Sequence, residues 1–308
     1  MKKVLVLGSA GSIGEYTLKY LLSEGKYEIT AVDLKNKKTV NKLKKYRNRI
    51  NIVYGDILDK VLMESLVKDH DVIINLATVL PPFSELNKKI TELVDYKGTK
   101  ELVDTISKVN PNCYLIYASS TSIYDKSPAS VQDKIDENNL SNYSLCKYKA
   151  EEIIKEKLKH YTILRIPLVL NKIEKESFIY TINKNDYVEV TTSMEAGYAV
   201  VRCIQYEKEL NKKIFNVGMG EEEKKLFNDI LKNILKYYGL SFKYILSRLF
   251  LEKSYKSNVT SDSDELDNII HYRFDSTYNY YKRLERIGKK RKIRKLLAKP
   301  IIHLKNKR

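Results

Sequence analysis

Residues 2–14 read KKVLVLGSAGSIG, an apolar run that ends in three glycines spaced three residues apart. A strand that leads through a glycine-rich turn into a helix lets the backbone approach a pyrophosphate, because the helix N-terminus offers free N–H groups. Gly8 then makes the turn, Gly11 the close approach and Gly14 the tight contact between helix and strand. The spacing is GxxGxxG and not the commoner GxGxxG, so a glycine turn in another α/β fold stays an alternative. The residues predicted to line this loop are Gly8, Gly11, Ser12, Ile13 and Gly14.

Strand-like and helix-like segments alternate through the first half of the chain. Short β-branched runs separated by amphipathic stretches are typical of a parallel sheet built from βαβ units. We therefore predict an α/β fold with a Rossmann-like, doubly wound parallel sheet. The predicted strands are 2–7, 27–33, 50–56, 71–77, 113–119 and 161–166, and the clearest helices are 12–23 and 142–159.

After Pro167 the alternation weakens, which predicts a smaller, mixed C-terminal region for substrate binding. Its expected elements are strand or loop at 186–192, helices at 194–208 and 222–238, a strand at 213–218 and a polar loop at 257–267 that opens a short helix. The chain then divides into a nucleotide-binding Rossmann domain (1–168), a mostly substrate-binding region (169–281) and a basic tail (282–308). The strand at 213–218 is expected to return to the first sheet.

Composition narrows the class of protein further. The chain of 308 residues has no run of about 18 apolar residues, the length that a spanning helix needs. Its first apolar run has four residues, fewer than the roughly 7–15 of a signal peptide, so we interpret it as a strand. Three widely spaced cysteines and four scattered histidines fit neither a disulfide framework nor a metal site. We expect a cytoplasmic protein without a metal.

Asp33 closes the second predicted strand, 19 residues after Gly14. A carboxylate at that place can accept hydrogen bonds from the ribose hydroxyls of a dinucleotide and repels a 2′-phosphate. The cofactor favoured for the first domain is therefore NAD, with NADP as the alternative. The basic residues that could still tolerate the phosphate are Lys35, Lys37 and Lys38.

Two further strand ends carry residues suited to a dinucleotide. Asp56 and Ile57 follow the third strand, where a carboxylate can accept from the adenine amino group and an apolar side chain can flank the ring. Ala77 follows the fourth strand, and its small side chain leaves room for the cofactor. Four such features at successive strand ends favour a phosphate cradle over a plain turn.

Two motifs farther along complete a pattern that resembles a known family. The segments concerned are GSAGSIG (8–14), Asp33, GDI (55–57), NLA (75–77), SSTSIY (119–124) and YSLCK (143–147), with weaker echoes in RIPLVL (165–170) and IFNVG (214–218). Together they resemble the extended short-chain dehydrogenase/reductase family, and within it the NAD-dependent sugar-nucleotide epimerase/dehydratase branch. The resemblance implies a further cofactor contact at Pro167.

The Tyr-x-x-x-Lys motif needs selection by position, because it occurs four times. The pairs are Tyr96/Lys100, Tyr143/Lys147, Tyr180/Lys184 and Tyr278/Lys282. Only Tyr143 and Lys147 lie past the fifth strand at the start of a long helix, where one helical turn puts both side chains on one face. An ammonium beside the phenol favours phenolate and lowers the tyrosine pKa, so Tyr143 can move a proton. Lys147 can also hold the nicotinamide ribose.

The third predicted catalytic residue is Ser120, which the family pattern places three residues before the Ile of Ile-Tyr. Its hydroxyl would hydrogen-bond the reacting oxygen of the substrate, although a plain Ser/Thr loop is the alternative. Thr121 and Ser122 stand where dehydratase-like members carry an Asp-Glu pair, which disfavours elimination. Asp95 stands in place of the usual Asn of N-V-x-G-T, and Asp125 in place of a glycine.

The resemblance implies an enzyme, an NAD-dependent epimerase that acts on a hexose ring hydroxyl of a sugar nucleotide, with Tyr143 as acid and base. A keto-sugar reductase or dehydratase of the same family stays an alternative. A non-catalytic NAD-binding sensor or scaffold is an alternative of another class. The family also implies a homodimer through helices near 84–108 and 142–159.

Most of the net charge of +17 lies at the C-terminus. Residues 282–308 hold thirteen Lys or Arg against one acid, Glu285. One interpretation is a solvated basic terminus. Another is contact with anionic lipid at the inner face of the membrane, because apolar residues interleave with the cations, and this would suit polysaccharide biosynthesis. No nucleic-acid partner is expected, since no recognition fold accompanies the charge.

Overall fold

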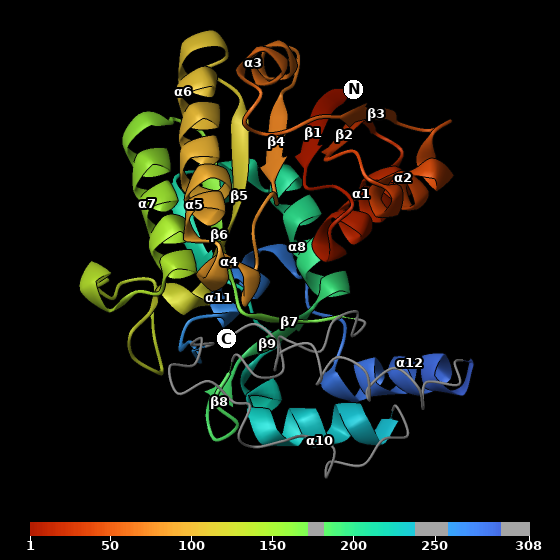
Figure 1. Cartoon of the computed structure of the whole chain (residues 1–308), viewed down its shortest axis with the longest axis vertical. Helices are drawn as coiled ribbons and strands as arrows, with labels where there is room; N and C mark the ends of the chain where they lie inside the picture. Colours follow the sequence, from red (N-terminus) through yellow and green to blue (C-terminus); the bar gives the residue numbers. More distant parts are fainter. Residues whose placement is uncertain (172–181, 238–257, 291–308) are drawn as a thin grey trace.

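The computed structural model describes residues 1–171, 182–237 and 258–290. Its centre is a seven-stranded, all-parallel sheet in the order β10-β6-β5-β4-β1-β2-β3 (Figure 1). The strands are β1 Lys2–Leu7, β2 Tyr27–Asp33, β3 Asn51–Tyr54, β4 Val72–Asn75, β5 Tyr114–Ser120, β6 Tyr161–Ile166 and β10 Lys213–Asn216. The order reverses between β1 and β4, as in doubly wound folds. The predicted Rossmann-like α/β fold is confirmed.

The strands form where β-branched and aliphatic residues run together, because the sheet is buried on both faces. In β1, Val4 to Leu7 are all buried, with Leu5 between Thr30 of β2 and Ile73 of β4. The strand expected at 213–218 is present as β10, which pairs with β6 at the sheet edge.

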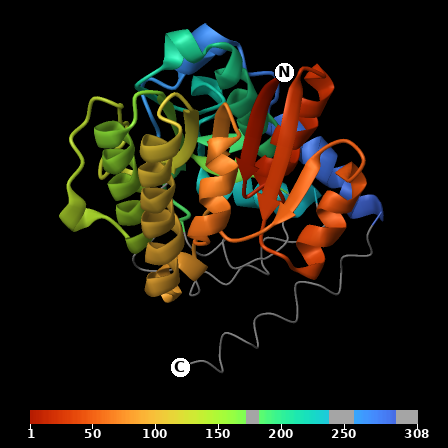
Figure 2. The same ribbon diagram turned by 90° about the horizontal axis from the view of Figure 1, so that it is seen from above.

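Helices cover both faces of the sheet, each with an apolar stripe turned inward. One face carries α1 Ser12–Glu24, α2 Lys37–Leu43, α8 Ser193–Gln205 and α11 Asp264–Ile270, and the other α3 Lys60–Lys68, α6 Thr99–Val109 and α7 Asn142–Lys157. In Figure 2 the orange, gold and green helices α3, α6 and α7 stand on one side of the strands. Each layer has its own buried core.

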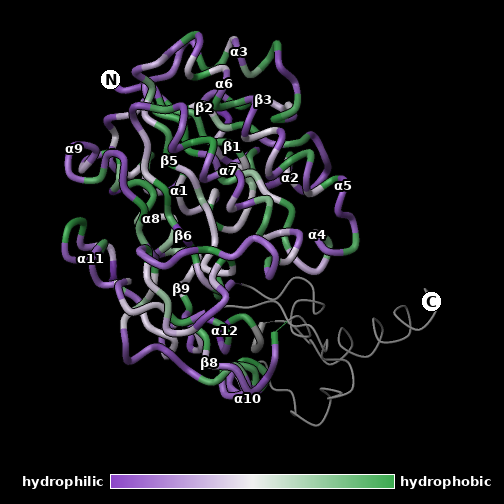
Figure 3. The backbone as a smooth tube through the Cα atoms, turned by 90° about the vertical axis from the view of Figure 1, so that its left-hand side faces the viewer, coloured by the Kyte–Doolittle hydropathy of each residue, from purple (hydrophilic) through white to green (hydrophobic). Residues whose placement is uncertain are grey.

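A smaller lobe lies at the carboxyl end of the sheet, below it in Figure 3. It consists of β7 Leu168–Leu170, β8 Tyr187–Val188, β9 Val190–Thr192, β11 Lys225–Leu226, α10 Phe227–Tyr237 and α12 Thr277–Lys290. Phe227, Leu231 and Leu284 help to form its core. The boundary expected between residues 281 and 282 falls inside α12, so the first residues of the predicted tail belong to a helix of this lobe.

Several predicted elements differ in detail from the structure. The helix expected near 84–108 is broken, because α4 Phe83–Leu86, α5 Lys88–Thr91 and the π-helical turn η2 Glu92–Gly98 precede α6. The helix expected at 222–238 begins only at Phe227, after a 3-10 turn and the short strand β11. The helix expected at 194–208 ends at Gln205 and is followed by a separate turn. The remaining elements are α9 Glu207–Leu210, η1 Lys44–Tyr46, η3 Thr121–Ile123, η4 Glu137–Asn139 and η6 Glu221–Glu223.

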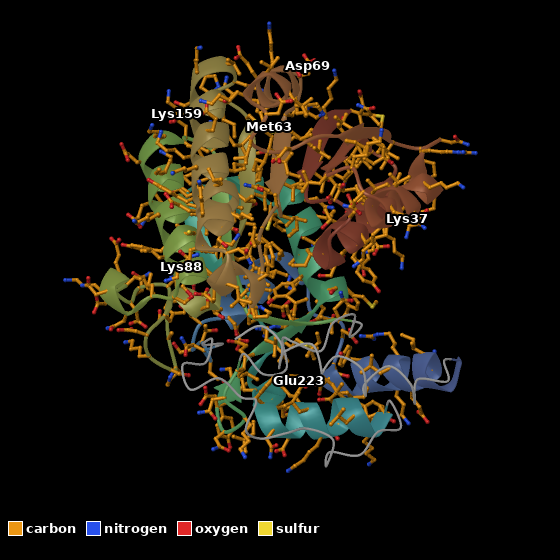
Figure 4. All side chains as sticks on the ribbon, viewed as in Figure 1. Lys37, Met63, Asp69, Lys88, Lys159 and Glu223 are labelled. Carbon is orange, nitrogen blue, oxygen red and sulfur yellow. The ribbon has the colours of Figure 1, made fainter. Side chains whose placement is uncertain are left out.

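Charged side chains cover the outside of both lobes, and a few, among them Lys147, Glu151 and Arg165, are buried. In Figure 4 the labelled Asp69, Lys88 and Lys159 are on the periphery, whereas Met63 of α3 is fully buried against the sheet. No helix among the described residues combines the length and the apolar character needed to cross a membrane.

Candidate active site

The glycine loop is shaped for close backbone contact. Gly8 has φ +76°, and a Cβ there would lie 2.8 Å from the backbone nitrogen of Ala77. A Cβ on Gly14 would lie 2.4 Å from the carbonyl oxygen of Gly8, so α1 can approach β1 only with glycine at this position. Gly11 is the N-cap of α1, and no side chain in the described part of the chain caps it. The first N–H groups of α1 therefore point into a cradle that suits a pyrophosphate.

Asp33 ends β2 beside this loop and is partly buried. One carboxylate oxygen accepts from the backbone N–H of Ala10 and the other from that of Leu34, both at 2.8 Å. Burial raises the pKa of Asp33 above its ordinary value, against the opposing effect of those two donors. Each oxygen keeps a further acceptor site, as ribose hydroxyls require.

A lysine that sequence reasoning missed lies against the glycine loop. The ammonium of Lys42, on α2, donates to the carbonyl of Ala10 at 2.9 Å and pairs with Glu15 at 3.0 Å. The lysines singled out from the sequence, Lys35, Lys37 and Lys38, are exposed. Because the carboxylate of Glu15 neutralises the ammonium of Lys42, the edge of the loop nearest Asp33 is not strongly basic. This favours NAD over a 2′-phosphorylated cofactor.

The remaining predicted cofactor residues also lie at carboxyl ends of strands. Asp56 follows β3 and accepts from the N–H of Leu58 at 3.0 Å. Ile57 is buried in the core under α3 and α6, and the more exposed side chain beside it is Leu58. Ala77 follows β4 against Gly8, and Pro167 lies between β6 and β7. Together with the glycine loop after β1 and Asp33 at the end of β2, the structure therefore brings predicted residues from five strands to one edge of the sheet.

Tyr143 and Lys147 lie in the first turns of α7, and both are buried. Ser141 caps the helix by accepting from the N–H of Ser144. The Lys147 ammonium lies 5.7 Å from the centre of the Tyr143 ring. The four-residue spacing thus puts both side chains on one face of the helix, as the sequence predicted, with the amine over the phenol ring.

Glu85 of α4 holds the start of α7 from outside the helix. Its carboxylate accepts from the backbone N–H groups of Asn142, at 3.1 Å, and Tyr143, at 3.0 Å. A carboxylate on the free N–H groups of a helix stabilises that end and fixes its place. Glu85 was not predicted, because nothing in its local sequence links it to a helix 57 residues away.

Lys147 is surrounded by groups that favour its charged form. Its Nζ donates to the carbonyl of Ala118 and pairs with a carboxylate oxygen of Asp95, both at 3.1 Å. It also lies 5.1 Å from the centre of the Tyr117 ring. Burial by itself would lower the pKa of Lys147, but Tyr117 and Asp95 outweigh it and hold that pKa above its ordinary value.

Ser120 is the buried last residue of β5. Its hydroxyl oxygen accepts from the N–H of Ser122, and the Ser144 hydroxyl donates to that of Ser122 at 2.9 Å. These bonds fasten the Ser120 turn to the helix turn that carries Tyr143. The neighbouring Thr121 hydroxyl is buried without a hydrogen-bond partner among the described residues.

A buried ion pair behind Ser120 also escaped prediction. Arg165 of β6 donates to both carboxylate oxygens of Glu151 on α7, at 3.1 and 2.7 Å from its Nε and Nη2. Glu151 also accepts from the hydroxyl of Ser119, and Arg165 donates to that of Tyr124 at 2.8 Å. The pair thus supports the strand end and the turn on both sides of Ser120.

Comparisons with known proteins agree with this geometry. A model of the NAD dependent epimerase/dehydratase family matches residues 4–177, more than half of the chain. A UDP-N-acetyl-alpha-D-glucosaminuronate decarboxylase of Bacillus cytotoxicus is 32% identical over 127 residues, which are 41% of this chain and 38% of that protein. A UDP-glucose 4-epimerase of Haemophilus influenzae is 27% identical over 164 residues, 51% of this chain and 48% of that protein. The chain therefore matches less than half of the length of either relative.

Similarity of structure extends over nearly the whole chain. The crystal structure of UDP-glucuronic acid 4-epimerase from Bacillus cereus, in complex with UDP-glucuronic acid and NAD, matches with a TM-score of 0.75 at 18% identity. The match covers 94% of this chain and 99% of that one. At this level of identity the two chains share a fold.

Proposed function

The chain belongs to the NAD dependent epimerase/dehydratase family, and from that premise we propose that it is a sugar-nucleotide epimerase acting at a ring hydroxyl of a hexose. The observation that carries the proposal is the buried Tyr143–Lys147 pair fastened beside Ser120. A 4-epimerase of a UDP-sugar among the matching relatives supports the same reaction class.

The residues at the sheet edge fit NAD. We assign the pyrophosphate to the loop of Gly8, Gly11, Ser12, Ile13 and Gly14, where glycine at positions 8 and 14 lets the loop and α1 lie directly against neighbouring backbone. The adenosine end is assigned to Asp33, Asp56 and Ile57, the middle to Ala77, and the nicotinamide end to Tyr143, Lys147 and Pro167. NAD, when bound, supplies the hydride acceptor of the reaction.

The protein's own part is to hold the sugar and move one proton. Tyr143, as phenolate, takes the proton of the ring hydroxyl as that carbon is oxidised, and returns it when the carbon is reduced again. Ser120 donates a hydrogen bond to the same oxygen, and the ammonium of Lys147 favours the phenolate. Inversion requires that the oxidised sugar turn its other face to the cofactor before reduction.

Elimination of water is disfavoured by the groups beside Ser120. Thr121 and Ser122 are buried hydroxyl residues, and the Ser122 oxygen accepts from Ser144. Neither has a side chain that can act as the acid or base of a dehydration at neutral pH.

A panel of UDP-, GDP- and dTDP-hexoses tests the reaction type. We expect the full chain with bound or equimolar NAD to interconvert one pair of C4 epimers with no change of mass, as read by chromatography and mass spectrometry of the products. A strict need for stoichiometric NADH or NADPH would instead establish the reductase. NAD binding with no turnover of any sugar would favour the sensor or scaffold.

The dimer and the membrane contact are separate proposals. The apolar side chains of Phe83, Leu86 and Ile90 are exposed around α4 and α5, in the predicted dimer region, which supports that prediction. The charge of residues 282–308, thirteen basic residues against one acid, supports contact with anionic lipid at the inner face of the membrane. Residues 291–308 lie outside the described part of the chain.

Deletion of residues 289–308 tests the membrane contact. The intact chain is expected to co-sediment with vesicles of anionic phospholipid at low salt and to be released at high salt, because the attraction is screened. The truncated chain should stay in the supernatant and keep its turnover. Equal co-sedimentation of both chains, or binding to neutral vesicles alone, would contradict the proposal.

A further inference from the structure

Asp95 is the buried partner of the lysine at the centre of the site. It lies in η2, the π-helical turn that precedes α6, and is fully buried. One carboxylate oxygen pairs with Lys147 Nζ at 3.1 Å and accepts from the hydroxyl of Thr78. The other accepts from the backbone N–H of Val79 at 2.9 Å. These three partners come from the loop after β4 and from α7.

The charge of Asp95 is not needed for these hydrogen bonds. An asparagine, the residue of the family pattern at this position, could accept from Val79 and Thr78 through its side-chain oxygen. A carboxylate adds one negative charge to a place without solvent, which costs desolvation free energy unless a cation offsets it. The ammonium of Lys147 is that cation, so the charge of Asp95 depends on Lys147, whereas the ammonium is also held by the carbonyl of Ala118 and lies over the Tyr117 ring.

We infer that Asp95 is a positioning residue that sets the working pH of the site, because its carboxylate holds the Lys147 ammonium and offsets part of the charge that Lys147 exerts on Tyr143. This inference rests on the proposed function. Like charges disfavour each other, so the Asp95 carboxylate beside the ammonium opposes the phenolate while Lys147 favours it. The balance between them decides the pH at which Tyr143 becomes a base.

The other groups around this pair leave Asp95 as the main opposing charge. Tyr117 of β5 lies under the ammonium. Burial raises the pKa of its phenol and outweighs the lowering effect of Lys147, so the phenol stays neutral. Burial raises the pKa of the Cys146 thiol to about 11, so that group is neutral as well. Glu151, farther along α7, is paired with Arg165. Glu85 faces the backbone N–H of Tyr143 and not the amine.

Asp95→Asn tests the inference, since it removes the charge and keeps the shape. Without Asp95 the full charge of Lys147 acts on Tyr143 and the phenolate forms at lower pH. We expect the rising limb of the pH–rate profile to move down by about one pH unit. Asp104→Asn is the matched control, because it removes a carboxylate from two more exposed ion pairs, with Lys100 on α6 and with Lys157 at the far end of α7. Its profile should coincide with that of the unchanged chain.

A second readout does not depend on turnover. With ¹³C at the ζ position of tyrosine, NMR follows each phenol, and the Tyr143 signal is the one that Tyr143→Phe lacks. Its titration midpoint in the NAD-bound protein should fall by the same amount in Asp95→Asn. An unchanged midpoint, or one moved to higher pH because Lys147 has lost its proton, would overturn the inference. If no sugar nucleotide reacts, the proposed function fails while the NMR result still decides the role of Asp95.

Discussion

Replacement of Tyr143 by phenylalanine is expected to lower kcat by about a thousandfold, within the range measured for loss of a general acid or base. The ring stays, so the packing at the start of α7 is kept, and only the group that moves the proton is removed. Binding of NAD should weaken only slightly, because the glycine loop, Asp33 and Lys147 are untouched and only one of the residues assigned to the nicotinamide end changes. The measurements are steady-state turnover of the reactive sugar nucleotide and calorimetric titration with NAD.

Tyr278→Phe is the matched control for this change. Tyr278 belongs to another Tyr-x-x-x-Lys pair, and the Lys282 ammonium lies 5.3 Å from the centre of its ring. The ring is exposed on α12, far along the chain from the sheet edge. Its variant should turn over like the unchanged protein. Full activity in Tyr143→Phe, or an equal loss in both variants, would contradict a catalytic role for Tyr143.

The sheet and the glycine loop could be predicted because their causes are local in sequence. A buried parallel strand needs a short β-branched run, and Gly8 and Gly14 are needed where a Cβ would strike the backbone. Among four equivalent motifs, the order of strands and helices selected Tyr143 and Lys147. The placing of these residues agrees with the sequence, whereas their roles stay predictions.

The supports of the site could not be predicted in the same way. Glu85 reaches α7, and Asp95 reaches Lys147, across more than fifty residues of chain. Such contacts depend on how the helices pack against one another, and the periodicity of apolar residues in the sequence carries no information on that packing. The sequence predicted one helix near 84–108, but four elements are found there, one of them the π-helical turn that holds Asp95. Such a turn inserts a residue into an otherwise helical pattern, which periodicity alone does not reveal. Asp95 was noticed only as a departure from the family pattern.

The largest expected loss of stability comes from Arg165→Met. Arg165 and Glu151 are almost fully buried, and the substitution leaves the Glu151 carboxylate without its cation. Breaking a buried pair in this way costs about 3–5 kcal/mol of unfolding free energy. The hydroxyl of Tyr124 also loses a donor at the turn beside Ser120. Urea unfolding followed by circular dichroism at pH 7 measures the loss.

The double variant Glu151→Gln/Arg165→Met separates charge from packing. If an unpaired buried charge causes the loss, then removing that charge must recover part of it, because Gln can still accept from Ser119. The double variant should therefore be more stable than Arg165→Met alone. Asp104→Asn, which breaks two more exposed pairs, should cost only about 1 kcal/mol. A double variant less stable than the single one would show that the Arg165 side chain stabilises the fold by packing and hydrogen bonding, and not by pairing with Glu151.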